Sequence, residues 1–188
     1  MFLVRTQPKT LIGTLIILRL RRTKFGIGRH HGRMDDIDSA IVRELQRDAR
    51  QTNRELAGKL NIAPSTCLER VRALRARGVI TGYRATVDLR ALNRPVQALL
   101  TVRIRPMNRE VIERFKAFLT SLPEVLSVYV VAGGDDFLVH VAVPDVDRLH
   151  ALLMDRIFKR REVVDCRSSV IYQHVANDVV EPLPAERS

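Results

Sequence analysis

Hydrophobic residues in the second half of the chain follow two periods in a fixed order, and this order restricts the possible fold more than any other feature. Apolar residues alternate, as in a half-buried strand, over 96–104, 125–131, 137–143 and 163–172. Between the first two of these segments, and again between the last two, apolar residues recur every three to four positions, as in an amphipathic helix. The order β-α-β-β-α-β predicts a four-stranded antiparallel sheet with both helices on one face.

This arrangement is the split βαβ, or ferredoxin-like, unit, and it predicts an α+β chain with a C-terminal domain at 96–176. Because both helices cover the same face, the apolar side chains on the other face need a different cover. We therefore expect a homodimer or a higher homo-oligomer. Residues 85–95 are interpreted as a linker strand or hinge, and residues 177–188 as a C-terminal tail.

Three short helices are predicted ahead of this domain, within residues 34–84. Thr52 and Glu55 have the spacing of a capping box, which predicts the start of the second helix. The third helix is predicted to begin near Pro64 and to end at Gly78. Two helices joined by a turn of about four residues are typical of a helix-turn-helix.

A β-ribbon is predicted directly after the third helix. Val79–Val87 reads as two short extended segments with Gly82 at the bend between them. With this ribbon, residues 34–84 are interpreted as an N-terminal winged helix-turn-helix domain. Cys67 lies among the apolar positions of the third helix and is interpreted as a small core side chain.

The third helix is the predicted recognition helix, because the second helix of a helix-turn-helix enters the major groove with its N-terminal residues at the base edges. It carries four arginines and one glutamate, a local charge of +3. Ser65 and Thr66 suit phosphate or base contacts, and Arg70, one turn later on the same side, can donate two hydrogen bonds to a guanine. The alternative is that these side chains form only a solvated helical face. The candidate DNA-binding residues are Thr52, Asn53, Ser65, Thr66, Glu69, Arg70 and Arg72.

The net charge of +11 is distributed unevenly, with +8 in residues 1–33, +3 in residues 34–84 and 0 in residues 85–188. A basic chain favours a polyanionic partner, and the basic helix-turn-helix makes double-stranded DNA the expected one. Residues 1–33 are interpreted as a basic leader translated from a start upstream of Met34, with a genuine basic arm or a targeting segment as alternatives. Its apolar run of eight residues is far shorter than the roughly 20 that span a bilayer, so no membrane partner is expected.

The sequence lacks the short motifs of phosphate-binding loops, dinucleotide sites, nucleophile elbows and zinc proteases. Its two cysteines, Cys67 and Cys166, form no metal-ligand pattern with histidines. We therefore expect no catalytic residues, no cofactor and no metal site. A chain with so few cysteines fits the reducing cytoplasm, and binding to DNA would associate it with the nucleoid.

The combination of a winged helix-turn-helix with a β-α-β-β-α-β domain resembles the Lrp/AsnC family of bacterial and archaeal transcription regulators. The resemblance covers about residues 35–176 and is carried by the stretches 35–38, 44–50, 67–74 and 78–83. It implies sequence-specific binding to DNA and dimers formed through the C-terminal domain, often assembled into octamers. It also implies a response to a small effector, usually an amino acid, bound between dimers.

The resemblance places the effector near the loop that joins the second and third strands. The family pattern there is Gly-Asp-Tyr/Phe-Asp, whereas this chain has Gly133, Gly134, Asp135 and Asp136, so the first acid and the aromatic residue are replaced. Independently of the family, exposed glycine amides can bind a carboxylate and an acidic side chain can bind an ammonium group, the two charges of an amino acid. The alternative is a plain tight hairpin.

Two further positions depart from the family pattern. In the last strand the family's Thr-Arg-Thr is Cys166-Arg167-Ser168, which keeps a hydroxyl only at Ser168. At the third helix the usual N-cap serine is Ala63, so a later capping box from Thr66 to Glu69 is an alternative helix start. The candidate effector-binding residues are Gly133, Gly134, Asp135, Asp136 and Ser168.

The sequence therefore predicts a DNA-binding transcriptional regulator modulated by an amino acid or a related small effector. A DNA-compacting architectural protein without an effector is the main alternative. An enzyme on the ferredoxin-like unit is a weaker one, because no nucleophile–base pair or metal cluster is visible.

Overall fold

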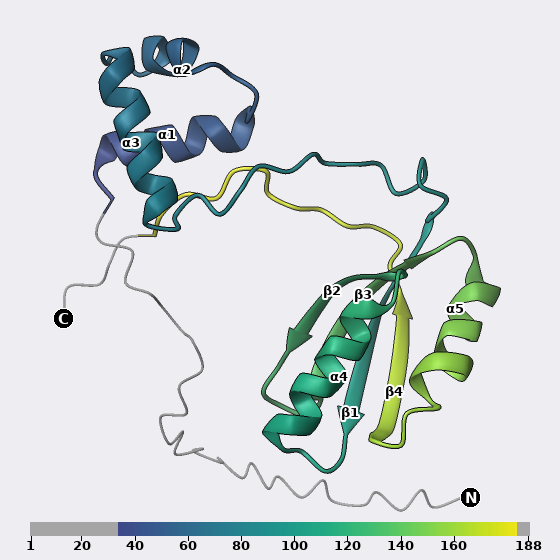
Figure 1. Cartoon of the computed structure of the whole chain (residues 1–188). Helices are drawn as coiled ribbons and strands as arrows, with labels where there is room; N and C mark the ends of the chain where they lie inside the picture. The colour runs from purple at the N-terminus through teal and green to yellow at the C-terminus, as the bar shows by residue number, and fades with distance from the viewer. Residues whose placement is uncertain (1–33, 184–188) are drawn as a thin grey trace, which may run out of the picture. The chain divides into compact units, whose positions relative to one another are not determined.

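The computed structural model describes residues 34–183, so the predictions for the basic leader at 1–33 and for the last five residues of the tail lie outside it. The chain forms two compact units (Figure 1). One contains the helices before residue 82, and the other contains the sheet and helices after it.

The first unit consists of α1 (Asp36–Arg47), α2 (Asn53–Lys59) and α3 (Pro64–Ala76). The predicted capping box of α2 is confirmed, because Glu55 N donates to Thr52 Oγ1 at 3.2 Å and Thr52 N donates to Glu55 Oε2 at 2.7 Å. These two bonds satisfy N–H groups that the first turn of a helix leaves unpaired.

The start of α3 differs from the alternative considered above. Its N-cap is Ala63, Pro64 occupies the first helical position, and no side chain accepts a hydrogen bond at this end. A capping box from Thr66 to Glu69 is therefore wrong, because proline already begins the helix two residues earlier. The predicted end at Gly78 is confirmed by its φ of 75°, the left-handed conformation that follows many helices.

The core of the first unit is small. Its fully or nearly fully buried apolar side chains are Ile41, Leu56, Ala57, Cys67 and Leu74. The interpretation of Cys67 as a core side chain is confirmed, and burial raises the pKa of its thiol. Partly buried apolar side chains such as Ile37 and Val71 pack around them, and a core with so few fully buried side chains is typical of a small, marginally stable domain.

The predicted ribbon over Val79–Val87 is wrong, because among the described residues no strand lies between α3 and β1. Val79 and Ile80 instead pack against the helical core, and both N–H groups donate to Leu74 O. Beyond them Tyr83 and Val87 are about half exposed. The apolar side chains of the predicted ribbon are therefore not buried, and a two-stranded ribbon without a buried face is only marginally stable. The predicted linker strand within 85–95 is also absent, and residues 88–94 form a compact turn in its place.

The second unit confirms the predicted order of elements. Its elements are β1 (Val96–Ile104), α4 (Arg109–Ser121), β2 (Val125–Val130), β3 (Phe137–Val143), α5 (Val146–Leu152), a π-helical turn (Leu153–Ile157) and β4 (Val163–Val170). The strands form one antiparallel sheet in the order β2-β3-β1-β4. The predicted hairpin is confirmed, since Val130 and Phe137 are paired at the ends of β2 and β3.

Each helix of the second unit begins at a polar cap. Asn108 Oδ1 accepts from Val111 N at 2.9 Å at the start of α4. The predicted cap of α5 is confirmed, because Asp145 Oδ1 accepts from Arg148 N at 2.7 Å. Such side chains replace the missing partners of the first-turn N–H groups and fix where a helix begins.

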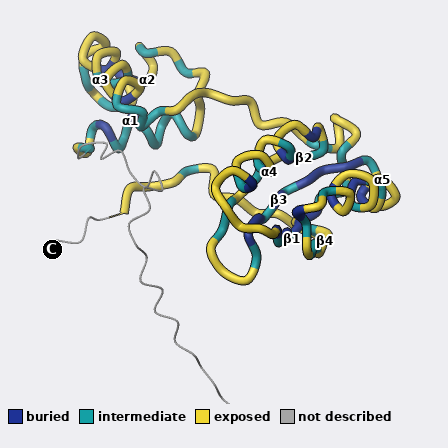
Figure 2. The backbone as a smooth tube through the Cα atoms, turned by 60° about the horizontal axis from the view of Figure 1, so that its bottom comes forward, coloured by how far each residue is buried: buried dark blue, intermediate teal, exposed yellow. Residues whose placement is uncertain are grey.

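The side chains of β1 point alternately to the two faces of the sheet. Leu100, Val102 and Ile104 are fully buried in a cluster with side chains of α4 and α5, such as Phe115 and Leu149. The buried stretches gather on these central strands and on the inward sides of both helices (Figure 2). Among residues 34–183 no helix packs on the other face, and this uncovered face carries the residues between the buried ones. Within residues 34–183 no helix has the length and apolar character needed to cross a membrane.

Candidate DNA-binding and effector sites

The predicted DNA-contacting side chains of α3 lie mainly on one exposed face. Ser65, Thr66, Glu69 and Arg72 are exposed, and steps of three to four residues place them in a row along the helix. Because Ala63 provides no capping side chain, the first N–H groups of α3 are free of side-chain partners. This face presents two hydroxyls, a carboxylate and a guanidinium, and it lies beside the uncapped N-terminus of α3. These groups suit both base and phosphate contacts.

Thr52 and Asn53 fix the connection between α2 and α3. Thr52 caps α2, and Asn53 Nδ2 donates to Pro64 O at 2.7 Å. The second bond ties the start of α2 to the first residue of α3, so it sets the position of the recognition helix.

The structure places Arg70 on a different side of α3 from Arg72. Arg70 lies three residues after Cys67 and four before Leu74, which are both fully buried. Its Nη1 donates to Asp35 Oδ2 at 2.6 Å and to Asp38 Oδ1 at 2.9 Å. The Asp38 N–H and the Arg70 guanidinium together lower the pKa of Asp35.

Asp38 is the centre of this ion-pair cluster. Its side chain is only 9% exposed, and its second oxygen accepts from Arg77 Nη1 at 3.1 Å. Two arginines of the α3 segment therefore hold the N-terminal turn of α1. In this arrangement Arg70 connects α1 to α3 through Asp35 and Asp38.

We expect Arg70→Ala to lower the unfolding temperature of the helical unit by about 2–5 °C, the scale of a partly exposed ion pair in a small domain. It should weaken binding to specific and random DNA by the same factor, because it acts through the position of α3. Calorimetry and fluorescence anisotropy on both DNAs measure these effects. A loss confined to specific DNA would instead make Arg70 a base contact.

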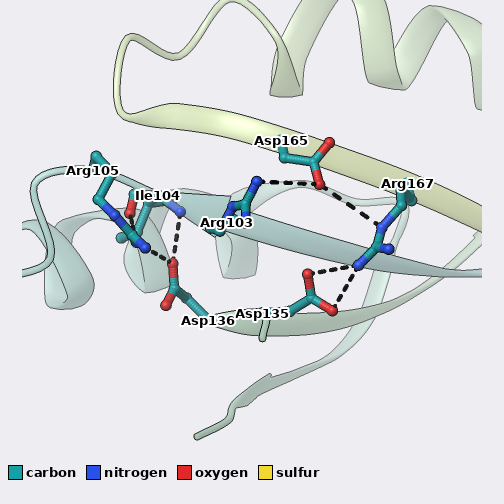
Figure 3. A network of polar contacts seen from close by, with 7 residues as sticks. All are labelled: Arg103, Ile104, Arg105, Asp135, Asp136, Asp165 and Arg167. Carbon is teal, nitrogen blue, oxygen red and sulfur yellow. Dashed lines mark hydrogen bonds and ion pairs between the residues drawn. The ribbon is translucent and has the colours of Figure 1, made fainter. Parts of the chain in front are cut away.

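In the loop between β2 and β3, Asp136 has an internal role. Its side chain is 8% exposed, and Oδ2 accepts from Ile104 N at 2.8 Å and from Arg105 Nη1 at 3.2 Å (Figure 3). Asp136 N in turn donates to Val102 O at 3.1 Å. These bonds fasten the start of β3 to the end of β1, so Asp136 holds the loop in place.

Asp135, the neighbouring acid, faces Arg167 of β4. Both carboxylate oxygens accept from Arg167 Nη2, at 2.9 and 3.0 Å (Figure 3). Gly133 has a φ of 152°, which a residue with a side chain rarely adopts, and a Cβ at Gly133 or Gly134 would touch nothing within 4 Å. The glycines therefore make the turn possible and leave the space around it open.

The structure does not bring Ser168 together with Asp135. Ser168 pairs with Leu100 of β1, so its side chain lies on the face that carries the buried cluster. Arg167 pairs with Thr101, and the Asp135–Arg167 contact lies on the uncovered face. Of the five candidate effector residues, four thus lie in the loop at 133–136, and Asp135 makes its contact on the uncovered face. Ser168 lies on the opposite face of the sheet.

The contact of Asp135 is extended by three residues that were not predicted as site residues, Arg103, Asp165 and Arg167. Asp165 Oδ2 lies 3.9 Å from Arg103 Nη2 and 3.8 Å from Arg167 Nε (Figure 3). Strand alternation alone places Arg103, Asp165 and Arg167 on one face, opposite to Cys166 and Ser168. We call Arg103, Asp135, Asp165 and Arg167 the charged cluster. Over residues 34–183, no three histidine, cysteine or acidic side chains are grouped so that they could hold a metal ion.

Comparison with protein-family models gives one match for each unit. Residues 34–81 match a winged helix-turn-helix DNA-binding domain, and residues 97–180 match the Lrp/AsnC ligand-binding domain. These two ranges contain α3 and the charged cluster respectively.

Curated relatives match across both units. The chain is 38% identical over 142 residues to the HTH-type transcriptional regulator AldR of Mycolicibacterium smegmatis, covering 76% of this chain and 83% of that protein. It is 32% identical over 142 residues to the leucine-responsive regulatory protein of Escherichia coli K12, covering 76% of this chain and 87% of that protein. Both alignments therefore span most of each protein.

A solved structure has a similar fold over most of this chain. A transcriptional regulator from Neisseria meningitidis, crystallised as a complex with L-methionine, matches with a TM-score of 0.73 and 29% identity. The match covers 81% of this chain and 97% of that one. The similarity therefore includes the fold of both units.

Proposed function

This chain belongs to the Lrp/AsnC family of DNA-binding transcriptional regulators, and on that basis we propose which of its residues contact DNA and where its effector binds. Ser65, Thr66, Glu69 and Arg72 contact base edges and phosphates from α3. The observation that carries this proposal is their shared exposed face on the second helix of the helix-turn-helix. Its test is the replacement of Thr66 and Arg72 by alanine, with binding measured on specific and random DNA.

The other candidates support that helix. Thr52 and Asn53 lie where α2 begins, and we assign them phosphate contacts in addition to their bonds within the turn. Arg70 fixes α3 against α1 through Asp38. Arg72 is thus the candidate for direct readout, since within residues 34–183 its guanidinium pairs with no acid and can approach a guanine.

We infer that the effector is an amino acid or a related small molecule bound near the loop at 133–136. The support is the match of 97–180 to a ligand-binding domain and the L-methionine complex of the Neisseria relative. Asp135 pairs with the exposed side chain of Arg167, whereas Asp136 binds the end of β1. Ser168 would contribute its hydroxyl from the other face only if the effector reached around the edge strand β4.

The uncovered face of the sheet fits a second copy of the chain. Leu99 and Tyr129 are 39% and 55% exposed, and a large apolar surface left in water favours association. We propose a homodimer through this face, with an octamer as the higher assembly that the family implies.

Such a regulator acts on the nucleoid in the cytoplasm and performs no catalysis.

Thermal unfolding of the full chain with each standard amino acid separates this function from that of an architectural protein. A regulator with an effector gains stability from at least one amino acid, because the ligand binds only the folded state. If every amino acid leaves the unfolding temperature unchanged, the architectural alternative is favoured.

A further inference from the structure

Glu69 is the one acidic residue in the sequence of α3, and its surroundings differ from those of most acids in the first unit. Its side chain is exposed, and within residues 34–183 its carboxylate forms no hydrogen bond or ion pair. Other acids of this unit are held by a basic side chain or by a helix cap, and they include Asp35, Asp38, Glu44 and Glu55. Glu69 is therefore a carboxylate that the fold of this unit does not use.

A carboxylate at this position opposes DNA binding unless it meets a particular group on the DNA. It repels phosphates, so it lowers the affinity for DNA of any sequence. The same face presents the hydroxyls of Ser65 and Thr66 and the guanidinium of Arg72, which all suit a polyanion. Glu69 lies between Thr66 and Arg72, three residues from each, so a duplex that contacts those two side chains also comes close to its carboxylate.

The base edges of the major groove offer one favourable partner for a carboxylate. Guanine and thymine present acceptors there, and adenine presents an acceptor beside its amino group. Cytosine presents its N4 amino donor, so a carboxylate can accept from it without facing another acceptor. On the basis of the DNA-binding function proposed for α3, we propose that Glu69 accepts a hydrogen bond from the N4 amino group of a cytosine. Glu69 thereby adds sequence preference while it lowers the affinity for DNA in general.

The spacing between Glu69 and Arg72 indicates where this cytosine lies relative to a guanine. The two side chains form no ion pair with each other, so each is available to a base. Residues three apart on a helix are separated by about 4.5 Å along its axis, and stacked base pairs are separated by about 3.4 Å. With α3 along the groove, this separation fits neighbouring base pairs better than a single pair. The expected recognition sequence therefore contains a cytosine for Glu69 and a guanine for Arg72 in neighbouring base pairs.

Selection of binding sites from random duplexes by the full chain, followed by sequencing, tests this assignment. Wild type should enrich a motif with cytosine and guanine in neighbouring base pairs. Glu69→Gln should replace that cytosine by adenine, because a glutamine amide can donate to adenine N7 and accept from its N6 amino group. Glu69→Ala should tolerate every base at this position. Both variants should keep the guanine that Arg72 binds.

Fluorescence anisotropy on the selected duplex and on random DNA measures the size of the effect. Replacing the cytosine by thymine should weaken wild-type binding by about tenfold, within the range for one base contact, and should not weaken Glu69→Ala. On random DNA, Glu69→Ala should bind about threefold more tightly than wild type, because a negative charge is removed. Glu110→Ala is the matched control, since it removes the same charge from an 87% exposed side chain of α4, and it should change neither affinity.

The base preference of the variants separates recognition from a merely solvated carboxylate. If both Glu69 variants select the wild-type motif, Glu69 contacts no base and the proposal is overturned, whereas DNA binding by α3 stands. If Glu69→Ala binds the selected duplex and random DNA more tightly by the same factor, the carboxylate only repels phosphates, which also overturns the proposal. If wild type itself selects no motif, sequence-specific binding fails together with the role of Glu69.

Discussion

Replacing Thr66 and Arg72 together by alanine is expected to weaken binding to the specific DNA site by at least about 2 kcal/mol, roughly 30-fold, because each lost base contact costs about 1–3 kcal/mol. Both side chains are exposed on the face of α3 that also carries Ser65 and Glu69. Binding to random DNA should fall much less, since only the charge of Arg72 contributes there. Fluorescence anisotropy on specific and random duplexes at several salt concentrations measures both quantities.

Two control variants separate the loss of base contacts from the loss of positive charge. Arg148→Ala removes the same positive charge from an exposed position at the start of α5, and it should leave specific binding nearly unchanged. Arg72→Lys keeps the charge but lacks the fork that binds guanine, so it should retain affinity for random DNA and lose sequence preference. An equal loss on both DNAs in the alanine variant would show that this face contacts phosphates only.

Leu74→Ala should destabilise the helix-turn-helix unit by about 2–5 kcal/mol, the cost of truncating a buried leucine that leaves a cavity. Leu74 is fully buried, and its carbonyl accepts the N–H groups of Val79 and Ile80, which end α3. Since this core contains few buried side chains, the loss is comparable to the whole stability of a small domain. DNA binding should disappear with it.

Urea unfolding followed by hydrogen exchange measures this effect separately in the two units. Amides of α1 to α3 should exchange rapidly in Leu74→Ala, whereas amides of β1 and β3 stay protected, because they belong to the other unit. Leu68→Ala is the matched control, since Leu68 lies on the same helix but is 39% exposed, and it should cost far less. Unchanged protection of α1 to α3 in Leu74→Ala would contradict the assignment of the core.

Most elements follow from local rules and were predictable from the sequence. Thr52 begins α2 with a capping box, and Asp145 begins α5 as a polar cap. Both act through bonds between residues three apart, so their spacing is visible in the sequence. The alternation of apolar residues is likewise a local pattern, and it predicted the four strands. The ribbon at 79–87 was wrong because its pairing depends on a partner strand, and none exists among the described residues.

The candidate sites were predictable only in part. Helical spacing identifies Ser65, Thr66, Glu69 and Arg72 as one face, but the ion pair of Arg70 joins residues 32 positions apart in the chain. The contact between Asp135 and Arg167 likewise spans 32 positions and depends on the register of β1 with β4. Such contacts are set by tertiary structure, which local patterns do not contain.

We expect this chain to recognise a DNA sequence and an amino acid to change that recognition. Footprinting of the full chain on the promoter DNA of its own gene, at moderate salt and with each standard amino acid added in turn, tests it most directly. We predict discrete protected sites that persist over random competitor DNA and whose extent or affinity changes with at least one amino acid. Uniform protection that competitor DNA removes equally well, and that no amino acid alters, would contradict the claim.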